Sequence, residues 1–221
     1  MFDAIKAYLE KRQHPQMIDG AMTAQLKVHL EKLQSPIELV ATLDDGSKAQ
    51  EMFALLNELV VLSDKIGVRH DGNDSRKPSF SVSRPGEEAR IRFAGIPMGQ
   101  EFTSLVLALL QTGGHPPKVD PDTTEKIRAI PGRLHFETYI TMSCHNCPDV
   151  VQALNLMAVL NHGISHTMID GNMFKNEIDQ LRIDAVPTVY LNGMMFNRGR
   201  KTLEEIITKV NAITVSPEAN N

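Results

Sequence analysis

Two cysteines, Cys144 and Cys147, are the residues of this chain best suited to chemistry, because their spacing brings two thiols within disulfide reach. They are the only cysteines among 221 residues. An apolar run over 135–140 predicts a strand before them, and apolar residues at helical spacing over 150–160 predict a helix after them. A helix N-terminus offers unpaired backbone N–H groups and a dipole that favour a thiolate at the first cysteine. Pro148 suits the first helical turn, where the N–H that proline lacks would have no partner.

A strand, then Cys-x-x-Cys, then a helix is the context of a thioredoxin-like redox motif. Two alternatives to redox chemistry remain open for the pair. A structural zinc site needs about four ligands, and the nearby histidines show no spacing clearly linked to the cysteines: His135, His145, His162 and His166. A purely structural disulfide would close a loop of only four residues, which removes little chain entropy. We therefore expect redox chemistry at the pair and no metal ion.

Composition and charge narrow the class of protein and its compartment. Hydrophobic residues form 42% of the chain and charged residues 23%, as in an ordinary soluble globular protein. A net charge of −4 gives no reason to expect a nucleic acid or an anionic membrane as partner. No run approaches the roughly 18 apolar residues of a membrane span, and the N-terminus is charged where a signal peptide would be apolar. We expect a cytoplasmic protein, a setting in which a lone cysteine pair is more often redox-active than structural.

The elements around the pair repeat one plan in two halves. The first half predicts helices over 22–34, 48–66 and 101–111, strands over 37–43 and near 68–70, and a hairpin of 78–82 with 90–95. The second predicts helices over 122–130, 174–181 and 202–211 beside the cysteine helix, a strand over 164–169, and a strand over 185–191 that an Asn192-Gly193 turn joins to 194–196. The fold class we predict is α/β, with two tandem thioredoxin-like folds packed together and mixed central sheets flanked by helices.

The predicted domain plan has four parts, divided at the Gly113–Pro117 break. Residues 1–20 form an N-terminal extension, 21–115 a thioredoxin-like fold without a cysteine pair, 116–213 the fold with Cys144-His145-Asn146-Cys147, and 214–221 a flexible tail. The first fold holds Asp44-Asp45-Gly46-Ser47 where the second holds its cysteines. It therefore cannot perform thiol chemistry itself.

Pro187 follows the predicted short helix and opens a strand. In thioredoxin-like folds the X-Pro bond that faces the cysteine pair is cis, and Val186-Pro187 fits that position. A cis bond leaves the backbone groups of Val186 free to pair with an extended substrate segment, a form of strand addition. An ordinary trans proline at the start of a strand is the alternative.

Three stretches form a pattern far more specific than a lone Cys-x-x-Cys: Gln100 to Leu110, Thr112-Gly113-Gly114-His115-Pro116, and Ser143 to Met157. They closely resemble the N-terminal region of the flavoprotein subunit of alkyl hydroperoxide reductase, and the resemblance spans roughly residues 20–213. It implies two fused thioredoxin-like folds with one active disulfide. It also implies electron transfer from the flavoprotein's disulfide-reductase core to a two-Cys peroxiredoxin, in hydroperoxide detoxification.

The same resemblance implies roles for individual residues. Cys144 is implied as the attacking thiol, Cys147 as its resolving partner and Pro187 as the cis proline, with Glu101 of the first fold near the disulfide. The chain departs from the family in lacking any G-x-G-x-x-G, the loop that cradles dinucleotide phosphates. We therefore expect a fragment or a stand-alone relative, with no cofactor in this chain beyond the disulfide and with FAD and NADH only on a separate or missing flavoprotein part.

Proton transfer from the resolving thiol needs a nearby acid–base group. In thioredoxin a buried Asp six residues before the first cysteine supplies it, but here that position is Thr138, and strand alternation turns Glu137 to the other face. Glu101 is then a candidate base, or else a helix-start residue favoured by the dipole. His145 lies between the cysteines and either holds the thiolate when protonated or is a solvated spacer.

The leading hypothesis is a thiol–disulfide oxidoreductase that reduces a two-Cys peroxiredoxin, with Val186 and Pro187 binding the substrate. A general protein disulfide reductase or glutaredoxin-like protein is the first alternative. A non-catalytic zinc or scaffold module is the second.

Overall fold

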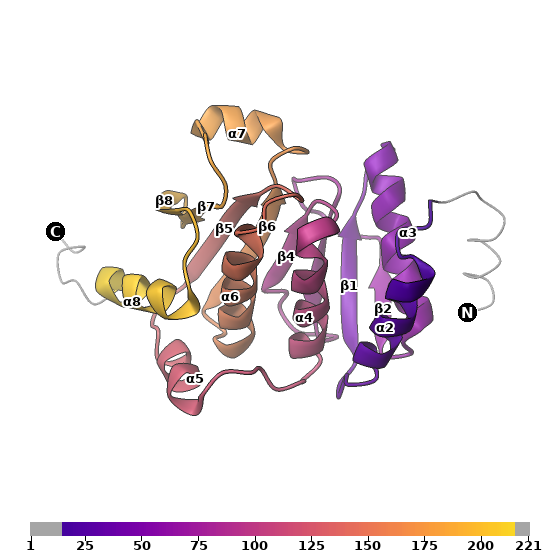
Figure 1. Cartoon of the computed structure of the whole chain (residues 1–221), viewed down its shortest axis with the longest axis horizontal. Helices are drawn as coiled ribbons and strands as arrows, with labels where there is room; N and C mark the ends of the chain where they lie inside the picture. Colours follow the sequence, from indigo (N-terminus) through magenta and orange to yellow (C-terminus); the bar gives the residue numbers. More distant parts are fainter. Residues whose placement is uncertain (1–14, 215–221) are drawn as a thin grey trace.

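The computed structural model describes residues 15–214, so most of the predicted extension and nearly all of the predicted tail lie outside the described residues (Figure 1). The helices are α2 (Gly20–Leu30), α3 (Ser47–Leu62), the 3-10 turn η1 (Gly99–Glu101), α4 (Phe102–Thr112), α5 (Pro121–Arg128), α6 (Cys147–Leu160), α7 (Lys175–Leu181) and α8 (Leu203–Thr214). The strands are β1 (Ile37–Thr42), β2 (Ile66–Arg69), β3 (Ser79–Ser83), β4 (Ile91–Ala94), β5 (Leu134–Ile140), β6 (Ile164–Asp170), β7 (Thr188–Leu191) and β8 (Met194–Arg198).

The eight strands form one continuous sheet in the order β2-β1-β3-β4-β6-β5-β7-β8. In each half a central strand pairs in parallel with one neighbour and antiparallel with the next: β1 with β2 and β3, and β5 with β6 and β7. The halves join where β4 and β6 pair in parallel, from Ile91 opposite His166 to Ala94 opposite Ile169. The predicted tandem fold is confirmed, but the two expected sheets are one. Pairing of β4 with β6 satisfies backbone groups that two separate sheets would leave at exposed edges.

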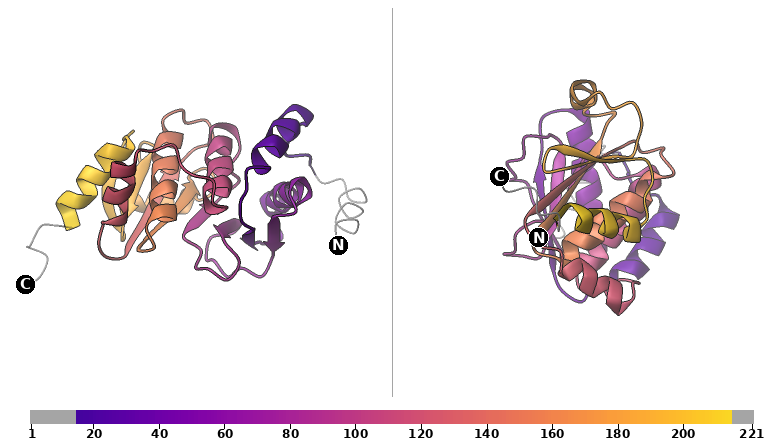
Figure 2. Two further views of the ribbon diagram at one scale, coloured as in Figure 1. Left: turned by 90° about the horizontal axis from the view of Figure 1, so that it is seen from below. Right: turned by 90° about the vertical axis from the view of Figure 1, so that its left-hand side faces the viewer.

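Helices α4 and α6 pack side by side across this junction, on one face of the sheet (Figures 1 and 2). Alternate residues of β5 divide between the two faces, as expected of a strand. Phe136 and Ile140 belong to the large core cluster, whereas Tyr139 belongs to a small cluster of its own. Helix α7 stands apart from the helical layer, beyond one end of the strands (Figure 1).

Several predicted boundaries need correction. Helix α2 begins at Gly20 rather than at 22, because the Asp19 side chain accepts a hydrogen bond from Met22 N and caps the helix there. Helix α3 ends at Leu62 rather than at 66, since Ile66 already pairs with Ile37 in the sheet. The strand expected over 185–191 begins only at Thr188.

The remaining elements lie close to their predicted positions. The Asn192-Gly193 turn is confirmed: its residues have φ of 49° and 80°, the positive values that a tight hairpin turn between β7 and β8 requires. The predicted break at 113–117 falls between α4 and α5, and the division into separate domains stays a prediction. Among residues 15–214 no helix is long and apolar enough to cross a membrane.

Candidate functional site

The cysteines lie in the loop between β5 and α6 and form a disulfide, with 5.5 Å between their Cα atoms. Cys147 is fully buried and Cys144 is partly exposed. The first thiol was expected at the helix N-terminus, but the structure corrects this. Cys147 is the first residue of α6, and Cys144 lies in the preceding turn, where its N–H donates to Thr141 O at 3.0 Å. Only the sulfur of Cys144 is therefore accessible to a second protein.

Val186-Pro187 is a cis peptide bond, as predicted. The Val186 carbonyl oxygen lies 4.0 Å from Cys144 Sγ. In the disulfide this sulfur carries no hydrogen, so the distance shows proximity rather than a hydrogen bond. The turn is closed on both sides, because Thr188 Oγ1 donates to Ala185 O at 2.7 Å and Gly199 N donates to Pro187 O at 2.8 Å. The Val186 backbone is thus held at the exposed cysteine.

A second cis peptide bond, Lys77-Pro78, was not predicted from the sequence. It opens β3 of the first half as Val186-Pro187 opens β7 of the second. The similar position of the two prolines before a hairpin strand was the available signal. The first half therefore keeps the backbone frame of the second without its thiols.

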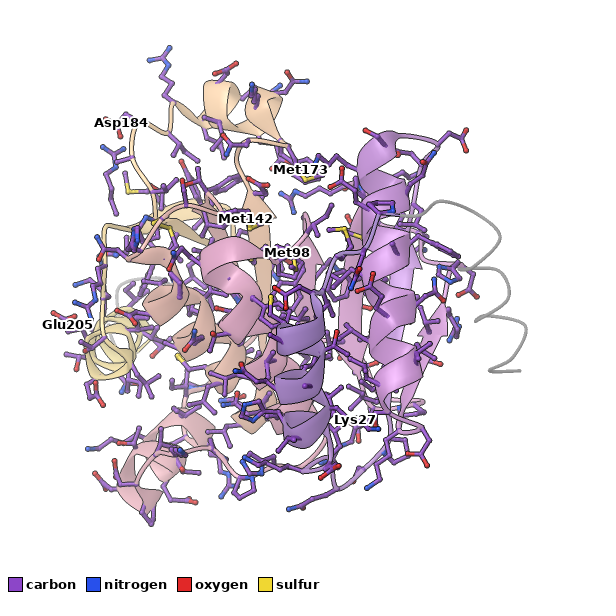
Figure 3. The ribbon with its side chains drawn as sticks, turned by 45° about the vertical axis from the view of Figure 1, so that its right-hand side comes forward. Lys27, Met98, Met142, Met173, Asp184 and Glu205 are labelled. Carbon is purple, nitrogen blue, oxygen red and sulfur yellow. A yellow bond between two sulfur atoms is a disulfide. The ribbon has the colours of Figure 1, made fainter. Side chains whose placement is uncertain are left out.

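The first half packs directly on the cysteine loop through η1. Gly99 has a φ of 57°, and a Cβ placed on it would lie 2.7 Å from Met142 O, so only glycine allows this approach. Gln100 N donates to the same oxygen at 3.0 Å. Figure 3 shows Met98 and Met142 near each other, and both pack against the main core. The loop that carries Cys144 is therefore supported by the half that has no cysteine.

Glu101, the last residue of η1, is fully buried, and neither of its carboxylate oxygens has a hydrogen-bond partner among the described residues. Burial raises the pKa of Glu101 to about 7, and the Ser104 hydroxyl nearby only moderates this rise. Ser104 Oγ instead accepts a hydrogen bond from Gln152 Nε2 of α6 at 3.2 Å. The side chain of Glu101 makes no capping bond to the described part of α4, which leaves the helix-start alternative without a contact.

Thr138 occupies the position of the buried carboxyl of thioredoxin and lies in a chain of buried hydrogen bonds. Thr138 Oγ1 is 2.8 Å from His166 Nε2, and His166 Nδ1 is 2.7 Å from Asn155 Oδ1. Because an amide oxygen only accepts, Nδ1 carries the proton and the Thr138 hydroxyl donates to Nε2. Burial lowers the pKa of His166 to about 3, so the ring is neutral near pH 7. These hydrogen bonds were not predicted from the sequence, and the only signal for them was the unusual Thr138.

Two further predicted positions can be placed. Glu137 points to the opposite face, as strand alternation predicts, and its Oε1 accepts from Arg76 Nη2 at 2.7 Å. His145 is exposed between the cysteines, which fits a solvated spacer. Its role in holding the thiolate stays a prediction.

Comparisons with known proteins agree with this geometry. A family described as a thioredoxin domain matches residues 134–211. The alkyl hydroperoxide reductase AhpF of Pseudomonas aeruginosa is 54% identical over 203 residues, which are 92% of this chain and 39% of that protein. The AhpF of Escherichia coli is 55% identical over 195 residues, covering 88% of this chain and 37% of that protein. The chain thus spans about two fifths of the length of these relatives.

The structural match covers both folds. The crystal structure of the NTD_N/C domain of AhpF from Enterococcus faecalis superposes with a TM-score of 0.81 at 28% identity, covering 87% of this chain and 99% of that chain. Because identity above 50% extends over nearly all of the sequence and the tandem fold is shared, this chain belongs to the AhpF family of alkyl hydroperoxide reductases and corresponds to the N-terminal domain of its members.

Proposed function

We propose that this chain is a dithiol–disulfide carrier that reduces a two-Cys peroxiredoxin and is itself reduced by a flavoprotein disulfide reductase. The observation that carries the proposal is the disulfide itself, with Cys144 partly exposed, Cys147 buried, and the Val186 carbonyl at the exposed sulfur. The relatives support hydroperoxide reduction as the process it serves, since those named above are alkyl hydroperoxide reductases.

The reaction follows from which sulfur is accessible. The Cys144 thiolate attacks one sulfur of the substrate disulfide, a mixed disulfide forms, and the other substrate sulfur leaves and takes up a proton. Cys147 then loses its proton, attacks Cys144 Sγ and releases the second substrate sulfur as a thiol after protonation. Two electrons and two protons have moved from the dithiol to the substrate. An extended substrate segment would pair with the backbone groups of Val186 beside the reacting sulfurs.

Glu101 is the group that we propose accepts the proton of Cys147. Three observations support this: the carboxylate is buried without a partner among the described residues, its pKa is about 7, and η1 packs on the cysteine loop. A base whose pKa lies near the working pH is half deprotonated there and can both accept and return a proton. Thr138 and His166, which fill the thioredoxin-like position, are neutral and already engaged with each other.

A single-turnover experiment tests the proposal. The whole chain, reduced and freed of reductant, is mixed with an oxidised two-Cys peroxiredoxin, and the transfer of both thiols is followed by rapid alkylation. We expect a second-order reaction that requires Cys144, and insulin reduced much more slowly than the peroxiredoxin. Equal rates with insulin would favour the general disulfide reductase instead. Thiols that react only after a chelator is added would favour the zinc module.

A further inference from the structure

The segment that carries Val186 hangs between α7 and β7, and α7 has an unusually weak hold on the core. None of the residues Lys175–Leu181, all of which the structure describes, is buried. Figure 1 shows this helix beyond the strand ends, joined to them by two loops. The position of the Val186 backbone therefore depends on whatever anchors α7.

One anchor of α7 is apolar. Phe174, Ile178 and Ile183 pack, half-buried, on the small cluster formed by Ala94, Tyr139, Ile169 and Tyr190. The contact is close, because a Cβ placed on Gly171 would lie 2.8 Å from Ile178 Cδ1. The cluster is small and partly open, so it offers limited buried area to fix the helix.

The other anchor is Arg76, which comes from the first half of the chain. Arg76 Nε and Nη2 each donate to one oxygen of Glu177 at 2.8 Å, a bidentate pair on the second residue after the start of α7. Nη2 also donates to Glu137 Oε1 of β5 at 2.7 Å, and the Tyr139 hydroxyl donates to Glu177 Oε2 at 2.7 Å. The side chains of the ion pair are only 20% and 26% exposed, so solvent screens it less than a surface pair.

Both members of the pair are charged at neutral pH. Burial alone would lower the pKa of Arg76, but hydrogen bonds to Glu177 and Glu137 outweigh it and raise the pKa above its ordinary value. Burial alone would raise the pKa of Glu177, and the bonds from Arg76 and Tyr139 outweigh it and lower that pKa. The contact therefore persists over the pH range in which thiol exchange occurs.

Arg76 is in turn fixed to the first half. Its backbone N–H donates to Asp74 Oδ1 at 2.7 Å, and Asp74 N donates to Thr42 Oγ1 of β1 at 3.1 Å. Asp74 also pairs with Arg92 of β4. The loop before β3 thus holds the guanidinium in place from one half while it grips α7 of the other.

The grip on α7 reaches Val186 over a very short stretch of chain. Ile183 N donates to Ile178 O at 3.0 Å, which ties the residue after α7 back onto the helix. On the other side Thr188 begins β7. Only residues 184–187 lie between these fixed points, so a shift of α7 must displace the Val186 backbone.

We propose that Arg76 is a positioning residue for protein substrates: by fixing Glu177 it holds the backbone groups of Val186 at Cys144 for pairing with an extended segment. The inference rests on the proposed function, because this edge matters only when a polypeptide disulfide binds. It assigns the cysteine-free half a part in substrate recognition that is separate from Glu101.

The test compares Arg76→Gln with Arg69→Gln in the whole chain. Arg69 is a matched control, since it contacts Glu38 at 3.3 Å and Asp71 at 2.9 Å but none of its ion pairs within residues 15–214 reaches the second half. Reduced protein is mixed with increasing oxidised peroxiredoxin, and separately with the small aromatic disulfide dithionitrobenzoate, which has no backbone to pair. We expect Arg76→Gln to raise the half-saturating peroxiredoxin concentration about tenfold with its maximal rate within about twofold. Dithionitrobenzoate reduction by Arg76→Gln, and all constants of Arg69→Gln, should stay near wild type.

Other results would overturn the inference. An unchanged half-saturating concentration in Arg76→Gln removes the positioning role. An equal loss with dithionitrobenzoate also removes it, because the disulfide itself would then be disturbed. If the wild-type chain does not reduce the peroxiredoxin, the proposed function fails, and this inference with it. Should circular dichroism show Arg76→Gln unfolded, Tyr139→Phe decides by the same criterion, since it keeps the ring and removes one bond to Glu177.

Discussion

The two halves of the molecule share one backbone frame and differ in chemistry. In the first, β1 leads through Asp44-Asp45-Gly46-Ser47 into α3, and a cis Lys77-Pro78 opens β3. In the second, β5 leads through the disulfide loop into α6, and a cis Val186-Pro187 opens β7. The strand, loop, helix and cis proline are thus not sufficient for a redox site. The thiols make the site, and the frame positions them.

The half without thiols still contributes to the site of the other half. Gln100 donates to the cysteine loop at Met142, Glu101 lies buried at the end of the same turn, and Arg76 grips α7. The hydrogen bonds of Gln100 and Arg76 cross between the halves, which β4 and β6 join into one sheet. Together with the proposals above, this indicates a division of labour: the second half carries electrons, and the first supplies a proton acceptor and a fixed position for substrate.

The largest effect is expected when the thiols are removed, because the second half then resembles the first. Cys144→Ser should abolish peroxiredoxin reduction, because no other accessible sulfur can attack. Cys147→Ser should instead trap a mixed disulfide through Cys144, visible on a non-reducing gel. In the reduced protein, alkylation at pH 6–7 should label Cys144 before Cys147, since Cys147 is fully buried. Faster labelling of Cys147 would reverse the two assigned roles.

Removing the carboxylate of the first half should have the next largest effect. Glu101→Gln should slow disulfide exchange at neutral pH by about 10- to 100-fold, at or below the usual range for a lost acid–base group. In wild type the rate should rise with pH around a pKa of about 7, and the variant should lose that step. The measurement is the pH profile of both resolving-thiol exchange and Cys144 alkylation. Superimposable profiles would reduce the first half to a scaffold with respect to proton transfer.

The same residue predicts a smaller effect on stability. The pKa of Glu101 is raised from 4.5 to about 7 in the folded protein, so its stabilising contribution is present below pH 4.5 and is lost as the pH rises through 7. Urea unfolding should show wild type losing on the order of 1–3 kcal/mol relative to Glu101→Gln as the pH rises from below 4.5 to above 7. A pH-independent difference between the two proteins would mean that the carboxyl is not buried as described.

The smallest expected signal concerns cofactors, where the two halves should not differ at all. Neither contains the glycine-rich loop that cradles dinucleotide phosphates, so we expect the purified chain to bind neither FAD nor NADH. Visible flavin absorbance after addition of FAD and gel filtration checks this, with a separate flavoprotein reductase as positive control. Co-eluting flavin would contradict the prediction.

Features that neighbouring residues encode could be predicted from the sequence alone. The cysteine spacing, the strand before it and the helix after it indicated the redox loop, and the positions of Pro187 and Asn192-Gly193 indicated a cis bond and a tight turn. The repeated order of elements indicated two folds. These inferences held because periodicity, turn chemistry and disulfide reach act over a few residues, and every residue involved can be seen in one short stretch.

Contacts between residues far apart in the chain emerged only with the folded structure. Thr138 and His166 are 28 positions apart, and Arg76 and Glu177 are 101 positions apart. No local pattern announces such a pair, because either residue alone has the composition of an ordinary strand or loop. The pairing of β4 with β6 belongs to the same class, since a buried strand shows its burial in the sequence but not its neighbour. Packing between the halves therefore settles which groups surround the disulfide loop, and the exclusion of water there gives Glu101 its raised pKa and the Arg76 pair its protection from solvent.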